Sequence, residues 1–284
     1  MKWFSFILLF IFVSLSSCGP SGGSNMLLGN VESDGSEESS AVISYGSISG
    51  NITDAEDGAT LSDVSVYILG FQTSTEVSTN STGEFSISSA PSGERYVVLS
   101  KSGYVSQTPS ATIPVNDELE NYNVSLVPDT TWSQDKFVIT LSWAETPADL
   151  DSYMYVPETG STHKIWYLNA TTRGDLTGDP YAQLDVDDID GEGPETIRIR
   201  YEGGSLDYNG VYRYYIHNLT GTPSFTDADA VVRIYRNQVL WKTYTACSGD
   251  DSLDWWHVFD LTGSTGSIAV GNDTCENSEP SDPN

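Results

Sequence analysis

Positively charged residues are scarce in this sequence. Only 12 of the 284 residues are Lys or Arg, against 40 Asp and Glu, which gives a formal net charge of -28. Such an acidic chain repels nucleic acid phosphates and anionic membrane surfaces wherever salt does not screen the charges. The composition therefore excludes nucleic acid as a partner. It also means that an acidic loop alone does not prove a site, because such loops keep a protein soluble.

Histidine and cysteine are also rare, with three of each. The sequence has no HExxH motif, and its few histidines and cysteines lack the local spacing of a zinc site. Ser252, His257 and Asp260 are close in sequence, but a catalytic triad is defined in space. Asp185 and Glu195 could serve as a glycosidase pair only in a cleft, and the sequence shows none. We therefore expect a protein that is not an enzyme.

Long apolar runs are confined to the N-terminus. Lys2 precedes a mostly apolar run, Trp3–Val13, which is too short to span a membrane but typical of a secretory signal. The next residues, "LSSC" ending at Cys18, resemble the lipobox of bacterial lipoproteins. The resemblance implies that signal peptide 1–17 is removed and that Cys18 is acylated. We expect a bacterial cell-envelope protein, held at the outer membrane or cell surface by its lipid anchor.

The rest of the chain is expected to be a flexible linker followed by β-structure. Residues 18–44 are rich in Gly, Ser and Glu, the composition of a tether. Beyond them, short runs rich in Val, Ile, Thr and Tyr alternate with turn residues, and no helical periodicity is present. The pattern predicts an all-β protein with two antiparallel β-sandwich domains in tandem, at 45–128 and 132–263, and then an acidic tail at 264–284.

The first of these domains carries glycines in a characteristic order. Gly46 and Gly50 lie in its first strand, Gly83 precedes "EF", and "SGY" ends at Tyr104. This order resembles the carboxypeptidase regulatory-like domain, which implies a prealbumin-like sandwich. Such modules serve as spacers or as adhesive and carbohydrate-contacting domains, so the resemblance implies no catalytic activity.

The second domain carries four motifs in order: "LSWAETPADLDSYMY", "LDVDDIDGEGPETIRI", "YRYYIHN" and "WWHVFDL". Together they resemble the YfaP-like domain of unknown function found in bacterial envelope proteins. We expect a jelly-roll-like sandwich here. The "DLDSYMY" strand is also similar to the Asp-x-Asp strand of bacterial pre-peptidase C-terminal sandwiches, some of which bind calcium.

The stretch "LDVDDIDGEGPE" crowds carboxylates that repel one another unless water or a cation separates them. Its spacing does not fit an EF-hand loop. We expect Leu184 and Val186 to point into the sandwich, and Asp185 and Asp187 to point outward together. A calcium site of irregular loop type would use a set of aspartates from two segments, with a solvated acidic surface as the alternative. The set is Asp149, Asp151, Asp187, Asp188 and Asp190.

The cysteines and a pair of neighbouring tryptophans give two further expectations. In an exported chain whose Cys18 is acylated, Cys247 and Cys275 remain as a disulfide pair. Alternation along "WWHVFDL" leaves at most one of Trp255 and Trp256 free to contact a ligand. We therefore expect a non-enzymatic envelope protein with a structural or adhesive role, whose partner is a glycan or another envelope protein. The alternative is a carbohydrate-binding module, which requires a row of exposed rings on one sheet face.

Overall fold

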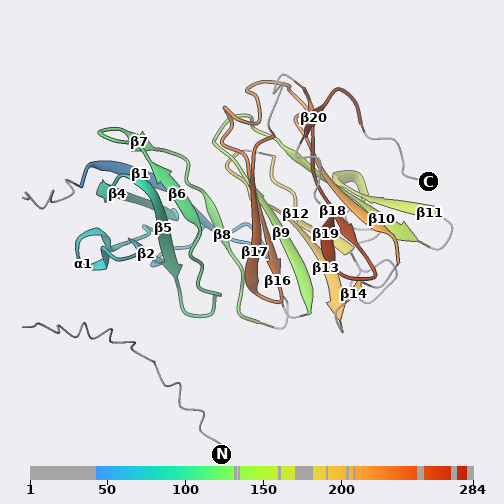
Figure 1. Ribbon diagram of the computed structural model, residues 1–284, viewed down its shortest axis with the longest axis horizontal. Helices are drawn as coiled ribbons and strands as arrows, with labels where there is room; N and C mark the ends of the chain where they lie inside the picture. Colours follow the sequence, from blue (N-terminus) through green and yellow to red (C-terminus); the bar gives the residue numbers. More distant parts are fainter. Residues whose placement is uncertain are drawn as a thin grey trace, which may run out of the picture. The chain divides into compact units, whose positions relative to one another are not determined.

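The computed structural model describes residues 43–130, 133, 135–158, 161–169, 182–189, 191–202, 205–206, 209–247, 253–269 and 274–279. Cys18, the expected signal peptide and nearly all of the linker lie outside these residues. Residues 42–284 form one compact unit, in which the described regular secondary structure is almost entirely strand (Figure 1). The described helical structure is short, consisting of α1 (Gln72–Thr75) and one 3-10 turn (Tyr167–Asn169). None of the described helices has the length and apolar character needed to cross a bilayer.

The first sandwich pairs a sheet of order β4-β1-β7, with β8 also on β1, with a sheet of order β3-β2-β5-β6. Alternate apolar residues of these strands are buried between the sheets, as the sequence pattern predicts. The pairings of β1 with β7 and β8 are parallel, whereas an antiparallel sandwich was expected. The strands are β1 (Tyr45–Asp54), β2 (Ser65–Ile68), β3 (Val77–Ser78), β4 (Glu84–Pro91), β5 (Gly93–Ser100), β6 (Ser110–Ile113), β7 (Glu118–Leu119) and β8 (Val124–Leu126).

The second sandwich also has two sheets, whose strands all pair antiparallel. One has the order β11-β10-β15-β18-β19 with β20 on β18, and the other β12-β13-β9-β16-β17 with β14 on β13. The strands are β9 (Lys136–Ser142), β10 (Asp151–Glu158), β11 (Ser161–Ile165), β12 (Ala182–Val186), β13 (Glu195–Glu202), β14 (Ser205–Leu206), β15 (Val211–His217), β16 (Val231–Arg236), β17 (Val239–Thr245), β18 (Trp255–Thr262), β19 (Ser267–Ala269) and β20 (Thr274–Glu276).

Strand β10 shows how alternation builds this second core. Met154 and Val156 are fully buried between the two sheets. Tyr153 and Tyr155 lie on the opposite face, in a separate aromatic cluster. The sequence places Asp149 and Asp151 in phase with these tyrosines, so both carboxylates are kept out of the apolar core.

The segment after residue 263 differs from the expected acidic tail. Strands β19 and β20 both pair with β18 and extend the sheet. Both strands have only three residues, so neither has enough alternation to be recognised in the sequence.

Candidate metal centre

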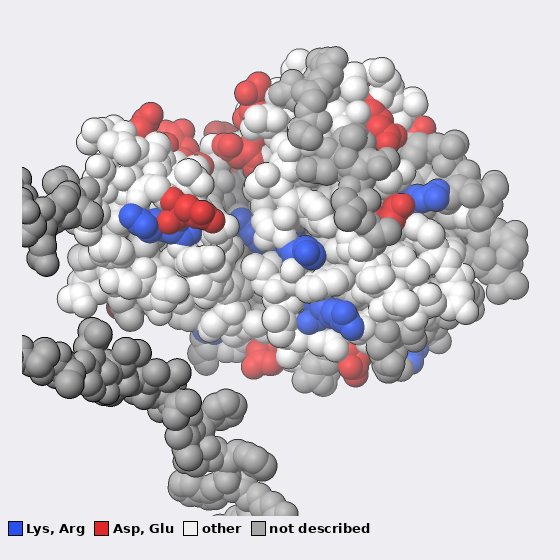
Figure 2. All heavy atoms as spheres, viewed as in Figure 1, with Lys and Arg blue, Asp and Glu red and all other residues white. Residues whose placement is uncertain are grey.

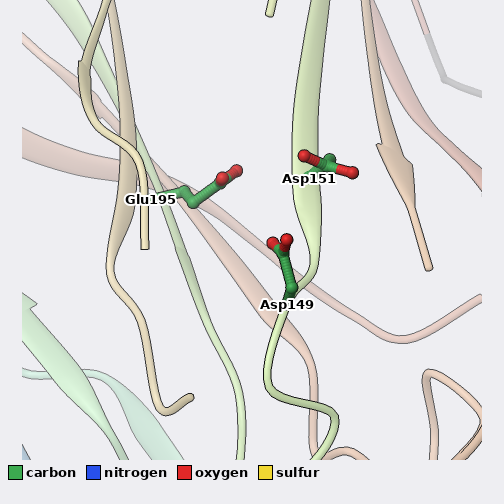
Figure 3. Close-up of side chains that lie close together, drawn as sticks. All are labelled: Asp149, Asp151 and Glu195. Carbon is green, nitrogen blue, oxygen red and sulfur yellow. The ribbon is translucent and has the colours of Figure 1, made fainter. Parts of the chain in front are cut away.

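Three carboxylates from two strands meet at one end of the second sandwich. Asp149 lies just before β10, Asp151 is its first residue, and Glu195 is the first residue of β13 (Figure 3). One carboxylate oxygen from each lies within 4.8 Å of the others. Residues 46 positions apart in sequence are thus brought together by the packing of one sheet on the other.

The cluster is sheltered from water. Glu195 has no exposed surface and Asp151 is 5% exposed, while Asp149 is half-buried. The Ser152 N–H donates a hydrogen bond to Glu195 Oε2. The other oxygen, Glu195 Oε1, and also Asp149 Oδ1, are buried and have no hydrogen-bond partner in the described part of the chain. Buried oxygens of this kind are costly unless a donor or a cation satisfies them.

Burial and mutual repulsion raise the pKa values of these acids. Desolvation, followed by the charges of Asp151 and Asp187, raises the pKa of Asp149 to about 6. Desolvation raises the pKa of Glu195 well above its usual value, and the neighbouring carboxylates of Asp151 and Asp187 add to the effect. Without a cation, the cluster therefore retains protons at pH values where ordinary carboxyl groups are charged.

The acidic stretch "LDVDDIDGEGPE" supplies further carboxylate oxygens at the edge of the cluster. Asp187 is exposed, and its charge raises the pKa values of Asp149 and Glu195, which places it beside the cluster. Asp188 Oδ1 accepts a hydrogen bond from the Gly191 N–H at 3.1 Å. Asp190, the remaining predicted ligand, lies outside the described residues. The structure thus brings Asp187 to the cluster of Asp149 and Asp151, and adds Glu195, which was not among the expected ligands.

Asp185 points away from the core as expected, because its partner Arg198 alternates along β13 with the buried Ile197 and Ile199. Its separation from Asp187 was not expected. Asp185 does not project with Asp187 but pairs with Arg198 of β13 in a nearly buried ion pair, with Arg198 Nη2 2.5 Å from Asp185 Oδ1. Leu184 enters the core as predicted, whereas Val186 is only half-buried. The cause is a β-bulge between Leu184 and Val186, where two residues oppose one on β13 and simple alternation ends.

The donor set of this centre consists of oxygens. Hard cations such as Ca²⁺ prefer carboxylate oxygens, and carboxylates from separate segments suit the flexible geometry of calcium. His217 is close, with Nδ1 3.6 Å from Asp151 Oδ2, but it is not part of the three-residue group. The residues present therefore fit a calcium ion, with Asp149, Asp151, Asp187 and Glu195 able to hold it.

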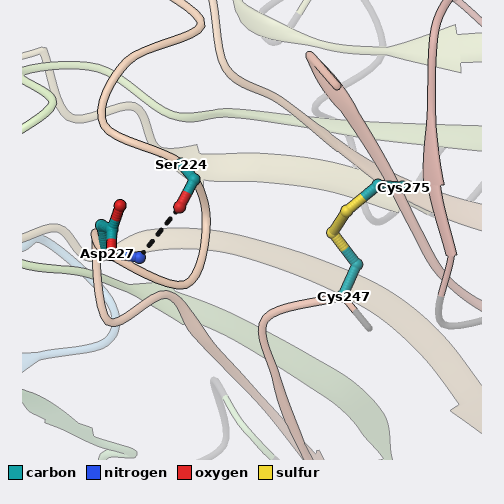
Figure 4. Close-up of a disulfide and its surroundings, with 4 residues drawn as sticks. All are labelled: Ser224, Asp227, Cys247 and Cys275. Carbon is teal, nitrogen blue, oxygen red and sulfur yellow. Dashed lines mark hydrogen bonds between the residues drawn. A yellow bond between two sulfur atoms is a disulfide. The ribbon is translucent and has the colours of Figure 1, made fainter. Parts of the chain in front are cut away.

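Cys247 and Cys275 form a disulfide across 28 residues (Figure 4). Cys247 follows β17, and Cys275 is the middle residue of β20, so the bond ties the two sheets of the sandwich together. By loop-closure arguments, such a bond stabilises the folded state by about 3 to 4 kcal/mol.

The two tryptophans expected to contact a ligand are covered. Trp256 has no exposed surface and belongs to the core, while Trp255 is 7% exposed. Trp255 packs edge-on against Tyr153 and stacks on His217. A row of rings does lie on this outer sheet face, but its tyrosines are also at most 5% exposed. In this structure, neither tryptophan offers a free face to a sugar.

Comparison with known proteins assigns the first sandwich. Residues 47–127 match the family model of the carboxypeptidase regulatory-like domain, in agreement with the resemblance noted from the glycines. The match covers less than a third of the chain. No curated protein matches the sequence.

Solved structures give only weak likenesses. A chain of a type II cohesin–X-dockerin complex from Acetivibrio cellulolyticus is 18% identical over 29% of this chain and 58% of that chain, with a TM-score of 0.24. The unknown-function protein SAV2460 is 15% identical over 52% of this chain and 93% of that chain, with a TM-score of 0.37. A candidate carbohydrate-binding protein from Bacteroides uniformis is 11% identical over 70% of this chain and 97% of that chain, with a TM-score of 0.24. The match thus spans little over half of the cohesin-complex chain, and at these TM-scores none of the likenesses bears on function. What the comparisons establish is a carboxypeptidase regulatory-like domain at residues 47–127.

Proposed function

We propose that the second sandwich binds a calcium ion through Asp149, Asp151, Asp187 and Glu195. In the same proposal, the protein is a non-enzymatic, lipid-anchored envelope protein with a structural or adhesive role. The observation that supports calcium binding most directly is Glu195, which is fully buried with one unpartnered oxygen beside two other carboxylates. A buried acid in such a place needs either a proton or a cation.

Calcium suits this place better than the other common ions. Magnesium demands a near-ideal octahedron and gives up its water reluctantly, so a cluster built by side chains from separate strands suits it poorly. Zinc favours nitrogen and sulfur ligands, and all three groups of the cluster are carboxylates. The bound ion would replace the protons that the raised pKa values retain and would fix the acidic stretch to the end of β10.

The test is thermal unfolding of the full chain in detergent with calcium, magnesium or chelator. Because an ion that binds only the folded state stabilises it by mass action, we expect millimolar calcium to raise the Tm. At a concentration 100 times the Kd, the gain is about 2.7 kcal/mol. Asp151→Asn and Asp187→Asn should each remove most of this shift while leaving the protein folded.

Asp227→Asn is the matched control for charge. Asp227 is exposed in a loop of the same sandwich, and its backbone N–H donates a hydrogen bond to Ser224 Oγ (Figure 4). Its carboxylate has no partner among the described residues. This variant should retain the full calcium shift. A wild-type shift no larger with calcium than with magnesium at equal ionic strength would show that the acidic stretch is only a solvated surface.

The lipid anchor rests on the sequence around Cys18. The protein expressed in a bacterium should incorporate a labelled fatty acid, and Cys18→Ser should abolish the label and leave uncleaved or released protein. Label that persists in Cys18→Ser would refute the anchor. Carbohydrate binding, the alternative role, would need a surface other than Trp255 and Trp256, because both rings are covered.

A further inference from the structure

A second feature is not part of the carboxylate cluster. It is a pocket of about 410 Å³ lined by residues of both sandwiches. This volume falls within the range of small-molecule and peptide-end sites. Ser110–Thr112 of β6 line it, together with Thr243 and Thr245 of β17. Tyr122 and Arg233 also line the pocket.

Arg233 is a buried cation that has no counter-ion among the described residues. It is 3% exposed, and its Nη1 donates hydrogen bonds to the Asn123 carbonyl at 3.0 Å and to Ser142 Oγ at 3.1 Å. Its Nε is buried without a partner, and no described carboxylate forms a salt bridge with it. Since an unpaired buried charge is costly, a carboxylate that enters the pocket would find a strong partner in the guanidinium.

The two strands in the lining are both sheet edges. Among the described strands, β6 pairs only with β5, and β17 pairs only with β16. Edge strands present unpaired backbone N–H and C=O groups, to which an extended peptide can add as a further strand. The pocket thus combines backbone pairing groups with a buried cation.

The rest of the lining carries the opposite charge. Glu94, Glu120 and Asp229 line the same pocket, and Arg233 is the one basic residue among its described lining residues. These three acids disfavour a ligand with several negative charges and favour basic groups. We propose that the pocket binds the free C-terminal end of an extended peptide, with the terminal carboxylate on Arg233 and with basic side chains before it.

The test measures the affinity of the full chain for a fluorescent hexapeptide with two lysines before a terminal Ala-Ala, by fluorescence anisotropy. The same peptide with a C-terminal amide lacks only the carboxylate. Because hydrogen bonds between charged groups contribute about 1.5 to 3 kcal/mol, we expect the amide to bind about tenfold or more weakly. Arg233→Gln should weaken the free acid to a similar extent and leave the amide unchanged.

Lys242→Gln is the matched control, because Lys242 is exposed on β17 and does not line the pocket. It should bind the free acid like the wild type.

Replacing both lysines of the peptide by glutamate should weaken binding if the acids of the lining act as proposed. Equal affinity for acid and amide, or no binding of either at millimolar peptide, would overturn the proposal. The comparison of acid and amide uses wild-type protein, so it holds even if Arg233→Gln unfolds the chain. It is also independent of the calcium site.

Discussion

At the scale of single residues, Glu195 combines full burial with a carboxyl group that is normally charged. Its carboxyl group is fully buried, and Ser152 satisfies only one of its two oxygens within the described residues. Desolvation raises its pKa well above 4.5, the usual value for Glu. In the folded, ion-free protein the acid form is favoured. The stabilising contribution of this group is therefore complete below about pH 4.5 and is lost as the pH rises through the raised pKa.

Glu195→Gln separates a calcium ligand from a buried acid of purely structural role. The amide has the same shape, can still accept the Ser152 hydrogen bond, and offers N–H donors to Asp149 and Asp151. We expect the variant to be more stable than the wild type in chelator at pH 7, by about 2 to 4 °C in Tm for each kcal/mol gained. It should no longer respond to calcium. Thermal unfolding in chelator and in calcium, at pH 4 and pH 7, measures both effects.

The pH series provides the control. At pH 4 the wild-type group is protonated, so wild type and Glu195→Gln should have nearly the same Tm in chelator. A variant that is less stable than the wild type at pH 7 in chelator, or that retains the calcium shift, would contradict a role for Glu195 as a ligand.

At the scale of elements, alternation predicts most of the strands but fails at β12. Leu184 was placed in the core correctly, since the pattern up to that residue is regular. The bulge after Leu184 then changes the phase of the strand, so that Val186 pairs with Thr196 and leaves the core face, while Asp185 pairs with Arg198. A bulge depends on how two strands pair, and the sequence of one strand does not record it. This is why the expectation that Asp185 and Asp187 project together is wrong, whereas the calcium site itself stays a prediction.

The sequence predicts some ligands of the proposed calcium site but not Glu195. Asp149 and Asp151 could be grouped because both lie on one strand face, and the crowding of carboxylates pointed to Asp187. Glu195 belongs to the same stretch and begins the next strand, where it is in phase with the buried Ile197 and Ile199. A charged side chain is almost never fully buried unless it is paired, so Glu195 was not among the expected ligands. Its burial follows from the packing of β13 against β10.

At the scale of the whole molecule, the negative charge has no equal positive counterpart. On the face shown in Figure 2, Lys and Arg side chains are few and lie apart from one another. With a net charge of -28, self-repulsion opposes the compact state, and salt should relieve it in a general way. A calcium ion held by buried carboxylates is screened much less than surface charges, so its effect should persist at high ionic strength.

The two sandwiches are joined by buried polar contacts as well as apolar ones. The Tyr235 hydroxyl of the second sandwich donates a buried hydrogen bond to Gln107 Oε1 of the first. Asn123 Nδ2 donates to the Trp143 carbonyl at 2.6 Å. A small apolar cluster spans the same junction, and it consists of Ala55, Val127, Val138 and Tyr235. Unfolding one sandwich would expose these groups on the other, which couples the stability of the two.

We therefore expect the full chain to unfold in a single calorimetric transition, and calcium to move that whole transition although its site lies in the second sandwich. Tyr235→Phe leaves Gln107 Oε1 without its donor, at a cost of about 1 to 3 kcal/mol. It should lower the Tm and broaden or split the transition, so that calcium then raises mainly one component. Tyr96→Phe, at a tyrosine of the first sandwich that is 53% exposed, should leave the wild-type profile unchanged. Two wild-type transitions, of which only one responds to calcium, would show that the junction does not couple the sandwiches.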